Sequence, residues 1–141
     1  MRVKQVIVIR KDLKMRKGKM IAQGSHASMA PILQLLRNNT PIENFNPEIK
    51  DGKYTLSMDI EVGSPLDEWL RKGFTKVCVY VNSEEELLNI YKKAKEKNLP
   101  TNLITDSGRT EFGGVPTNTC IAIGPDEVEK IDEITGHLPL L

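Results

Sequence analysis

Short runs of β-branched residues alternate with helical segments along this chain, and this order restricts its fold more than any other feature. The strand-like runs cover residues 5–10, 76–81, 101–105 and 119–123. Helical patterns cover residues 18–37, 84–97 and 126–134, and a shorter helix opens at Ser64-Pro65. Strands that alternate with helices form sheets whose faces are covered by helices. We therefore predict an α/β sandwich around a largely parallel or mixed sheet.

Two of the helices carry local signals of their own. Ser83 and Glu86 have the spacing of a capping box at the start of a helix that Pro100 ends. The residues expected to be buried on that helix are Leu87, Leu88, Tyr91 and Ala94. In the first helix, Pro31 should kink or interrupt the helix, because a proline ring clashes with the carbonyl group one turn earlier.

Residues 38–65 differ in character from the rest of the chain. They begin with turn-forming residues and continue with five apolar residues that alternate with polar ones: Tyr54, Leu56, Met58, Ile60 and Val62. A period of two predicts a half-buried strand at a sheet edge or in a hairpin, at about residues 40–63. We expect residues 1–141 to form a single domain that contains this segment.

Composition bears mainly on the cellular compartment. The early apolar run Val6–Ile9 is too short for a signal peptide or a membrane span, so no membrane association is expected. Cys78 and Cys120 both lie in strand-like runs, which predicts buried, reduced thiols. Reduced cysteines are typical of the cytoplasm, which is the predicted location.

Charge is distributed unevenly along the chain. Residues 1–37 contain nine Lys and Arg against one acid, whereas residues 38–141 contain eleven basic and eighteen acidic residues. The basic residues gather in a short stretch that follows the first strand: Arg10, Lys11, Lys14, Arg16, Lys17 and Lys19. Such a cluster favours a nucleic acid or another polyphosphate as ligand, although a merely solvated basic face is the alternative.

The helix that follows this cluster contains the first candidate site. Lys19, Gln23 and His26 are spaced at i, i+4 and i+7, so they share one face of the helix. The second candidate is Asp106, which directly follows a strand. Ligands of α/β sheets gather beyond the carboxyl ends of strands. If the sheet is mainly parallel, Lys19 and Asp106 should therefore come within reach of each other.

Other kinds of site fit the sequence less well. A phosphate-binding loop at Gly18-Lys19 lacks an earlier glycine, because position 13 is Leu, and lacks the Ser or Thr that Met20 replaces. A metal site is poorly supported, since the chain has only His26 and His137 and no clustered cysteines. Structural explanations also stand: His26 could be a packing residue, and Asp106 could cap a turn that a following glycine completes.

Three stretches of the chain together resemble a known family. They are KQVIVIRKDLKM-x-KGK-xx-AQ-x-SHA near the start, NSEEELLNIYKKAKEKNLPTNLITDSGRTEF in the middle, and IGP with ITGHLPLL at the end. In residues and order they resemble the archaeal and eukaryotic type of peptidyl-tRNA hydrolase, the type 2 family. The resemblance covers residues 4–37 and about 69–141, so residues 38–65 look like an insertion relative to compact members.

The resemblance implies a three-layer α/β/α sandwich around a four-stranded mixed sheet, often in a homodimer. It implies hydrolysis of the ester between a peptide and the terminal ribose of tRNA, with tRNA as the partner and no metal or cofactor. The implied active-site residues are Lys19, Gln23, His26, Asp106 and Thr110. Residues expected to contact the substrate are Lys11, Lys14, Arg16, Lys17 and Arg109.

A mechanism follows as a hypothesis. Asp106 would orient or deprotonate the attacking water with support from His26, and Lys19 would stabilise the developing negative charge, helped by Gln23 and Thr110. The alternative from another class is a non-catalytic module that binds RNA or a protein through the basic N-terminal face.

Overall fold

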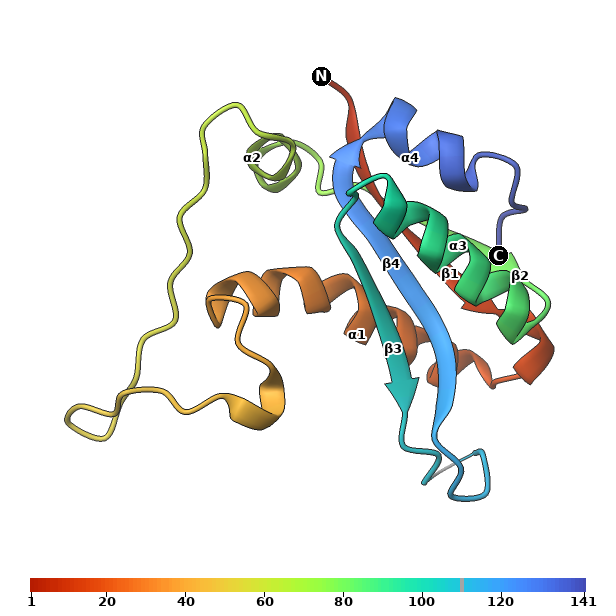
Figure 1. The fold of residues 1–141 in the computed structure, drawn as a ribbon, viewed down its shortest axis with the longest axis horizontal. Helices are drawn as coiled ribbons and strands as arrows, with labels where there is room; N and C mark the ends of the chain where they lie inside the picture. The colour runs from red at the N-terminus through yellow and green to blue at the C-terminus, as the bar shows by residue number, and fades with distance from the viewer. Residues whose placement is uncertain (110) are drawn as a thin grey trace.

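The structure, a computed structural model, describes residues 1–109 and 111–141 (Figure 1). Its strands are β1 (Val3–Arg10), β2 (Lys76–Val81), β3 (Thr101–Asp106) and β4 (Thr117–Glu127). Its helices are α1 (Lys17–Leu36), α2 (Pro65–Arg71), α3 (Glu84–Glu96) and α4 (Val128–Thr135), with short 3-10 turns η1 (Lys11–Leu13) and η2 (Ile42–Asn44). The predicted alternation of strands and helices is confirmed.

The four strands form one mixed sheet in the order β2-β1-β4-β3. Strand β1 is parallel to β2 and antiparallel to β4, and β4 is in turn antiparallel to β3. Strands β1 and β3 therefore run in the same direction on either side of β4. Their carboxyl ends lie at the same end of the sheet, which is the condition under which the segment after β1 and the segment after β3 can meet.

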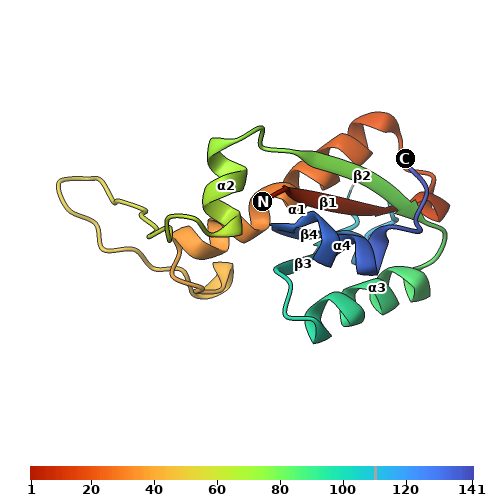
Figure 2. The same cartoon turned by 90° about the horizontal axis from the view of Figure 1, so that it is seen from above.

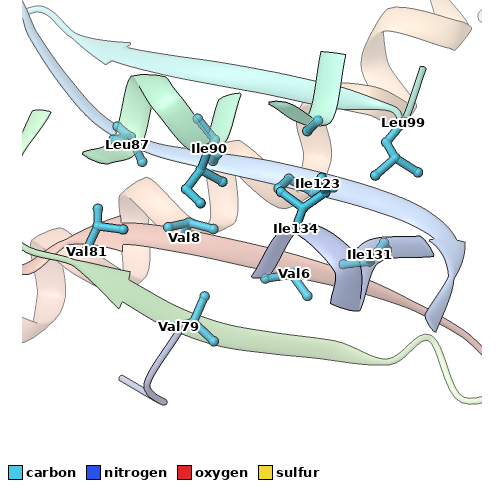
Figure 3. Packing of buried hydrophobic residues seen from close by; sticks show 12 residues of the cluster. Val6, Val8, Val79, Val81, Leu87, Ile90, Leu99, Ile123, Ile131 and Ile134 are labelled. Carbon is cyan, nitrogen blue, oxygen red and sulfur yellow. The ribbon is translucent and has the colours of Figure 1, made fainter. Parts of the chain in front are cut away.

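Helices cover both faces of this sheet, as the view from above shows (Figure 2). Alternate side chains of β1 point to opposite faces, which is the period of a strand. Val6 and Val8 join the core under α3 and α4 (Figure 3), whereas Ile7 and Ile9 join the smaller core under α1. This layering confirms the predicted α/β/α sandwich.

Helix α1 approaches the sheet closely because its inner residues are small. Ala27 is fully buried, and a Cβ atom added to Gly24 would lie 3.9 Å from side-chain atoms of Ile7 and Ile9. The predicted interruption at Pro31 is wrong, since the helix continues through this buried residue to Leu36. Packing against the sheet outweighs the loss of one backbone hydrogen bond.

The capping signal of α3 is confirmed, with one difference. The backbone N–H of Glu86 donates to the Ser83 hydroxyl at 3.0 Å, but the Glu86 carboxylate accepts from Asn82 rather than from Ser83. The prediction that Leu88 is buried is wrong, because it is 36% exposed, while Ile90 is buried. Leu87 and Ile90 lie three positions apart and so share the inner face.

The strand predicted for residues 54–62 is absent from this described segment. Residues 38–63 instead form an excursion that extends away from the sheet (Figure 1), with an isolated bridge between Lys50 and Lys53. Tyr54 and Val62 are exposed. Alternation only places side chains on two sides of an extended chain, and a strand also needs a neighbouring strand with which to exchange hydrogen bonds. Its status as an insertion stays a prediction.

The two cysteines differ, so the prediction of two buried thiols holds only for one. Both are free, but Cys120 is buried, whereas Cys78 on β2 is exposed, because β2 is an edge strand that α1 does not cover. Burial raises the pKa of the Cys120 thiol to about 11. In the part of the chain that the structure describes, no helix is long and apolar enough to cross a membrane.

Candidate active site

The first turn of α1 and the end of β3 meet through an ion pair. The Lys19 ammonium lies 3.0 Å from Oδ1 of Asp106, and both side chains are largely buried, at 14% and 13% exposure. The predicted meeting of these two residues is confirmed, and its cause is the shared direction of β1 and β3. The site therefore lies at the carboxyl end of two strands, where α/β folds bind ligands.

Gln23 connects the same carboxylate to the sheet. Its amide nitrogen donates to Asp106 Oδ1 at 3.2 Å, and its amide oxygen accepts from the hydroxyl of Thr119 on β4. Gln23 is only 3% exposed and Thr119 is fully buried. A buried amide whose two ends are both hydrogen-bonded is fixed in orientation. Gln23 therefore holds its donor toward Asp106.

The second oxygen of Asp106 holds the loop that follows β3. Oδ2 accepts from the backbone N–H of Gly108 at 2.8 Å. Gly108 has φ +81°, and a Cβ atom there would lie 2.2 Å from the carbonyl oxygen of Val115. Only glycine fits this position. The structural explanation of Asp106 as a turn residue is thus also correct, because its two oxygens have different partners.

These donors set the protonation state of Asp106. The hydrogen bond from Lys19 is the main cause that lowers the pKa of the carboxyl below its usual range, and the Gly108 N–H and the Gln23 amide add to it, while burial opposes it. Asp106 is therefore a carboxylate at neutral pH. A carboxylate with a lowered pKa is a weak base but a good acceptor for orienting a donor.

A basic segment lies at η1 and the start of α1, next to the Lys19 end of this site. The exposed residues there are Lys11, Lys14, Arg16 and Lys17. Arg16 lies 4.0 Å from Glu111 of the loop after β3, which brings that loop beside the basic segment. Arg10 differs from this group: it is buried, its guanidinium pairs with Asp12 and it donates to the backbone carbonyl of Asn118. Arg10 thus stabilises the fold.

Comparisons with known proteins show to which family the chain belongs. A model of the family described as "Peptidyl-tRNA hydrolase PTH2" matches residues 3–141. A protein of Methanocaldococcus jannaschii named "Peptidyl-tRNA hydrolase" is 45% identical over 139 residues, which cover 99% of this chain and 100% of that protein. Proteins of the same name from Nanoarchaeum equitans and Methanopyrus kandleri are 44% and 40% identical over 138 residues, 98% of this chain and 98% and 97% of theirs. This chain belongs to the peptidyl-tRNA hydrolase PTH2 family.

The remaining predicted site residues are placed less centrally in this PTH2 family member. His26 is exposed and lines a groove together with Asp106 and Gln23, but among the described residues its side chain makes no hydrogen bond. Arg109 is exposed in the loop after β3. Thr110 lies outside the described residues. The structure thus brings together Lys19, Gln23 and Asp106 and leaves His26 on the groove wall.

Sequence reasoning missed Thr119. A hydroxyl at the start of the apolar run 119–123 was the available signal, but nothing local indicates that its partner would be the amide of Gln23 on another element. Among the described residues, no group of three or more His, Cys, Asp or Glu is placed to hold a metal ion.

Proposed function

We propose that this chain hydrolyses the ester that joins a peptide to the 3'-terminal ribose of tRNA, which releases free tRNA. The observation that carries the proposal is the buried cluster of Lys19, Gln23 and Asp106 beside an exposed basic segment. The names of the relatives support the same reaction. An ester hydrolase needs a positioned water and a stabilised oxyanion, and this cluster contains groups suited to both.

In the proposed reaction, the oxygen of a water molecule attacks the carbonyl carbon of the ester. Asp106 accepts a hydrogen bond from this water and orients it, and His26, which lines the same groove, takes its proton. The Lys19 ammonium stabilises the negative oxygen of the tetrahedral intermediate, with the Gln23 amide and the Thr110 hydroxyl as further donors. The bond from carbon to the ribose oxygen then breaks, and the proton passes to that oxygen.

The exposed basic residues would bind the tRNA through its phosphates. The residues assigned to this role are Lys11, Lys14, Arg16, Lys17 and Arg109. Phosphate contacts fix the position of a nucleic acid without reading its sequence, as a hydrolase that acts on many tRNAs requires. Residues 38–65 contain more acidic than basic residues, so they are not assigned to tRNA contact.

The proposal includes three further properties. The reaction needs no metal or cofactor, because the cluster itself supplies the charges. The protein acts in the cytoplasm, where its substrate arises. It forms a homodimer, and an apolar groove between α1 and β2 supports this, since exposed Ile21, Met29 and Phe74 line it.

One assay separates the proposed hydrolase from the alternative, a non-catalytic module that binds RNA or a protein through the same basic face. N-acetyl-aminoacyl-tRNA is incubated with the protein in excess chelator, and the unblocked aminoacyl-tRNA serves as the control. Release of free tRNA from the blocked substrate supports the metal-free hydrolase. Binding of tRNA without release supports the module and contradicts the proposal.

A further inference from the structure

A groove runs along the outer edge of β3, away from the basic segment. Its cavity volume is about 500 Å³, which is within the usual range for ligand sites. One end is formed by Gln23, His26 and Asp106, and the walls continue along α1 to Arg37 and along the segment 40–42. The groove therefore begins at the proposed reaction centre and leads away from it.

The charges on either side of the reaction centre differ. The basic segment of exposed lysines and arginines lies at the start of α1, whereas Arg37 at the far end is the only Lys or Arg among the described residues that line the groove. Between the two ends the groove is lined by apolar residues and uncharged polar ones: Ala30, Leu33, Gln34, Ile42, Asn102 and Ile104. The basic segment is suited to bind phosphates, and the groove is suited to bind an uncharged chain.

The floor of the groove is the edge strand β3. In the described sheet β3 is outermost, and it pairs only with β4. The N–H of Gly124 donates to the carbonyl of Pro100 at 2.8 Å, and Asn102 pairs with Ala122 two positions on. Residues of an antiparallel strand alternate between facing the partner and facing away. The register shifts between Ile104 and Thr105, but the extra residue, Thr119, is on β4, so β3 keeps its own alternation. This phase directs the N–H and C=O groups of Leu103 and Thr105 outward.

We propose that this groove binds the peptide part of the substrate as an added strand alongside β3. The inference rests on the proposed function. With its ester at Asp106, the peptide extends toward Thr101 and so runs parallel to β3. Six strand residues at roughly 3.3 Å each accommodate about five peptide residues. Recognition through main-chain groups reads few side chains, so one groove serves peptides of any sequence.

The first test varies the length of the peptide. The kcat/KM of the wild-type protein is measured on tRNAs that carry N-acetylated chains of one to six residues. The groove predicts a rise of roughly two- to tenfold for each added pair of main-chain hydrogen bonds, with a plateau at about five residues. A kcat/KM that is independent of length overturns the groove but leaves the proposed function intact. Failure to hydrolyse even the one-residue substrate removes the proposed function itself.

The second test uses the period of the strand. Single amides of a five-residue chain are replaced by esters or N-methylated amides, one position at a time. Replacement at alternate positions should lower kcat/KM by roughly two- to tenfold, whereas replacement at the positions between them should lower it little. Equal losses at all positions, or none at any, contradict strand addition.

A variant of the protein gives an independent readout. Ala30 lies on the groove wall, so Ala30→Phe should narrow the groove and lower kcat/KM for the five-residue substrate by roughly tenfold, with little change for the one-residue substrate. Leu35→Phe enlarges an exposed residue of the same helix outside the groove and is the matched control. Equal losses on both substrates, or equal effects of both variants, overturn the proposal.

Discussion

The two faces of the sheet are built from different kinds of residue. Under α3 and α4, the core is a large apolar cluster that includes Val6, Val8 and Leu87 (Figure 3). Under α1, a smaller apolar cluster shares the interface with buried polar groups, among them Gln23 and Thr119. A buried polar group destabilises a fold unless it is hydrogen-bonded. The first face therefore contributes mainly apolar packing, and the second face combines packing with the positioning of the proposed catalytic residues.

A second polar contact under α1 shows how that positioning works. The hydroxyl of Ser28 donates to the amide oxygen of Gln5 on β1 at 2.6 Å, and the Gln5 amide nitrogen donates back to the Ser28 carbonyl at 3.2 Å. Apolar packing alone tolerates small sliding of a helix, whereas paired hydrogen bonds fix its register. The Gln5–Ser28 contact thus fixes α1 about two and a half turns away from Lys19.

The largest expected effect is on catalysis, from the α1 face. Asp106→Asn keeps the shape of the side chain but removes its charge, so kcat should fall by about 10²- to 10⁴-fold. Lys19→Ala should lower kcat by about a hundredfold, because it removes the donor to the developing oxyanion. Turnover of N-acetyl-aminoacyl-tRNA measures both, and circular dichroism checks that the fold is retained. Unchanged turnover in both variants would discard the assignment of these residues.

The next largest effect is on stability, from the face of the sheet under α3 and α4. Leu87 is fully buried under α3, so Leu87→Ala should lower the free energy of unfolding by about 2–5 kcal/mol. Denaturant unfolding measures this change, and kcat per folded molecule should stay unchanged. Leu88→Ala is the matched control, because Leu88 is partly exposed on the same helix and should cost far less. A loss of kcat in folded Leu87→Ala protein would contradict the separation of the two faces.

How much of this arrangement follows from sequence depends on whether its cause is local. The ion pair of Lys19 with Asp106 was predictable, because the direction of strands decides which loops meet. The alternation of apolar and polar residues from Tyr54 to Val62 led to the wrong prediction of a strand, because a strand needs a neighbouring strand that no local pattern supplies. The exposure of Cys78 required knowing that β2 is an edge strand. The partnership of Gln23 with Thr119 likewise depends on the packing of two distant elements.

A smaller effect is expected when the contact between Gln5 and Ser28, which fixes α1, is removed. Ser28→Ala leaves the buried Gln5 amide oxygen without its donor, which should cost about 1–3 kcal/mol of stability. Because the helix also carries Lys19, kcat should fall severalfold as well, unlike in Leu87→Ala. Gln5→Leu combined with Ser28→Ala removes both polar partners and should recover part of the stability without recovering kcat. Equal recovery of both quantities would show that the contact serves stability only.

Substitutions in the basic segment should affect binding rather than turnover. Arg16→Ala or Lys17→Ala should raise KM severalfold with little change in kcat, and each should reduce the slope of log KM against log salt by about one. Arg10→Ala is a contrasting variant, because the loss of this buried side chain should lower stability rather than raise KM. A wild-type KM that does not depend on salt would contradict the electrostatic role of this segment.

The smallest effect is the dependence of stability on acid. The pKa of Asp106 is lowered from 3.8 in the folded state, chiefly by Lys19, so its contribution to stability is complete above that value. The contribution is lost as pH falls through the lowered pKa, because the folded state must then take up the proton. The stability difference between wild type and Asp106→Asn should therefore be constant from about pH 7 to pH 5 and shrink below about pH 4. Leu87→Ala should shift the whole curve without changing its shape, since the α3 face contributes packing that no proton alters. A difference for Asp106→Asn that stays constant down to pH 2 would show that the carboxylate gains nothing from its donors on the α1 face.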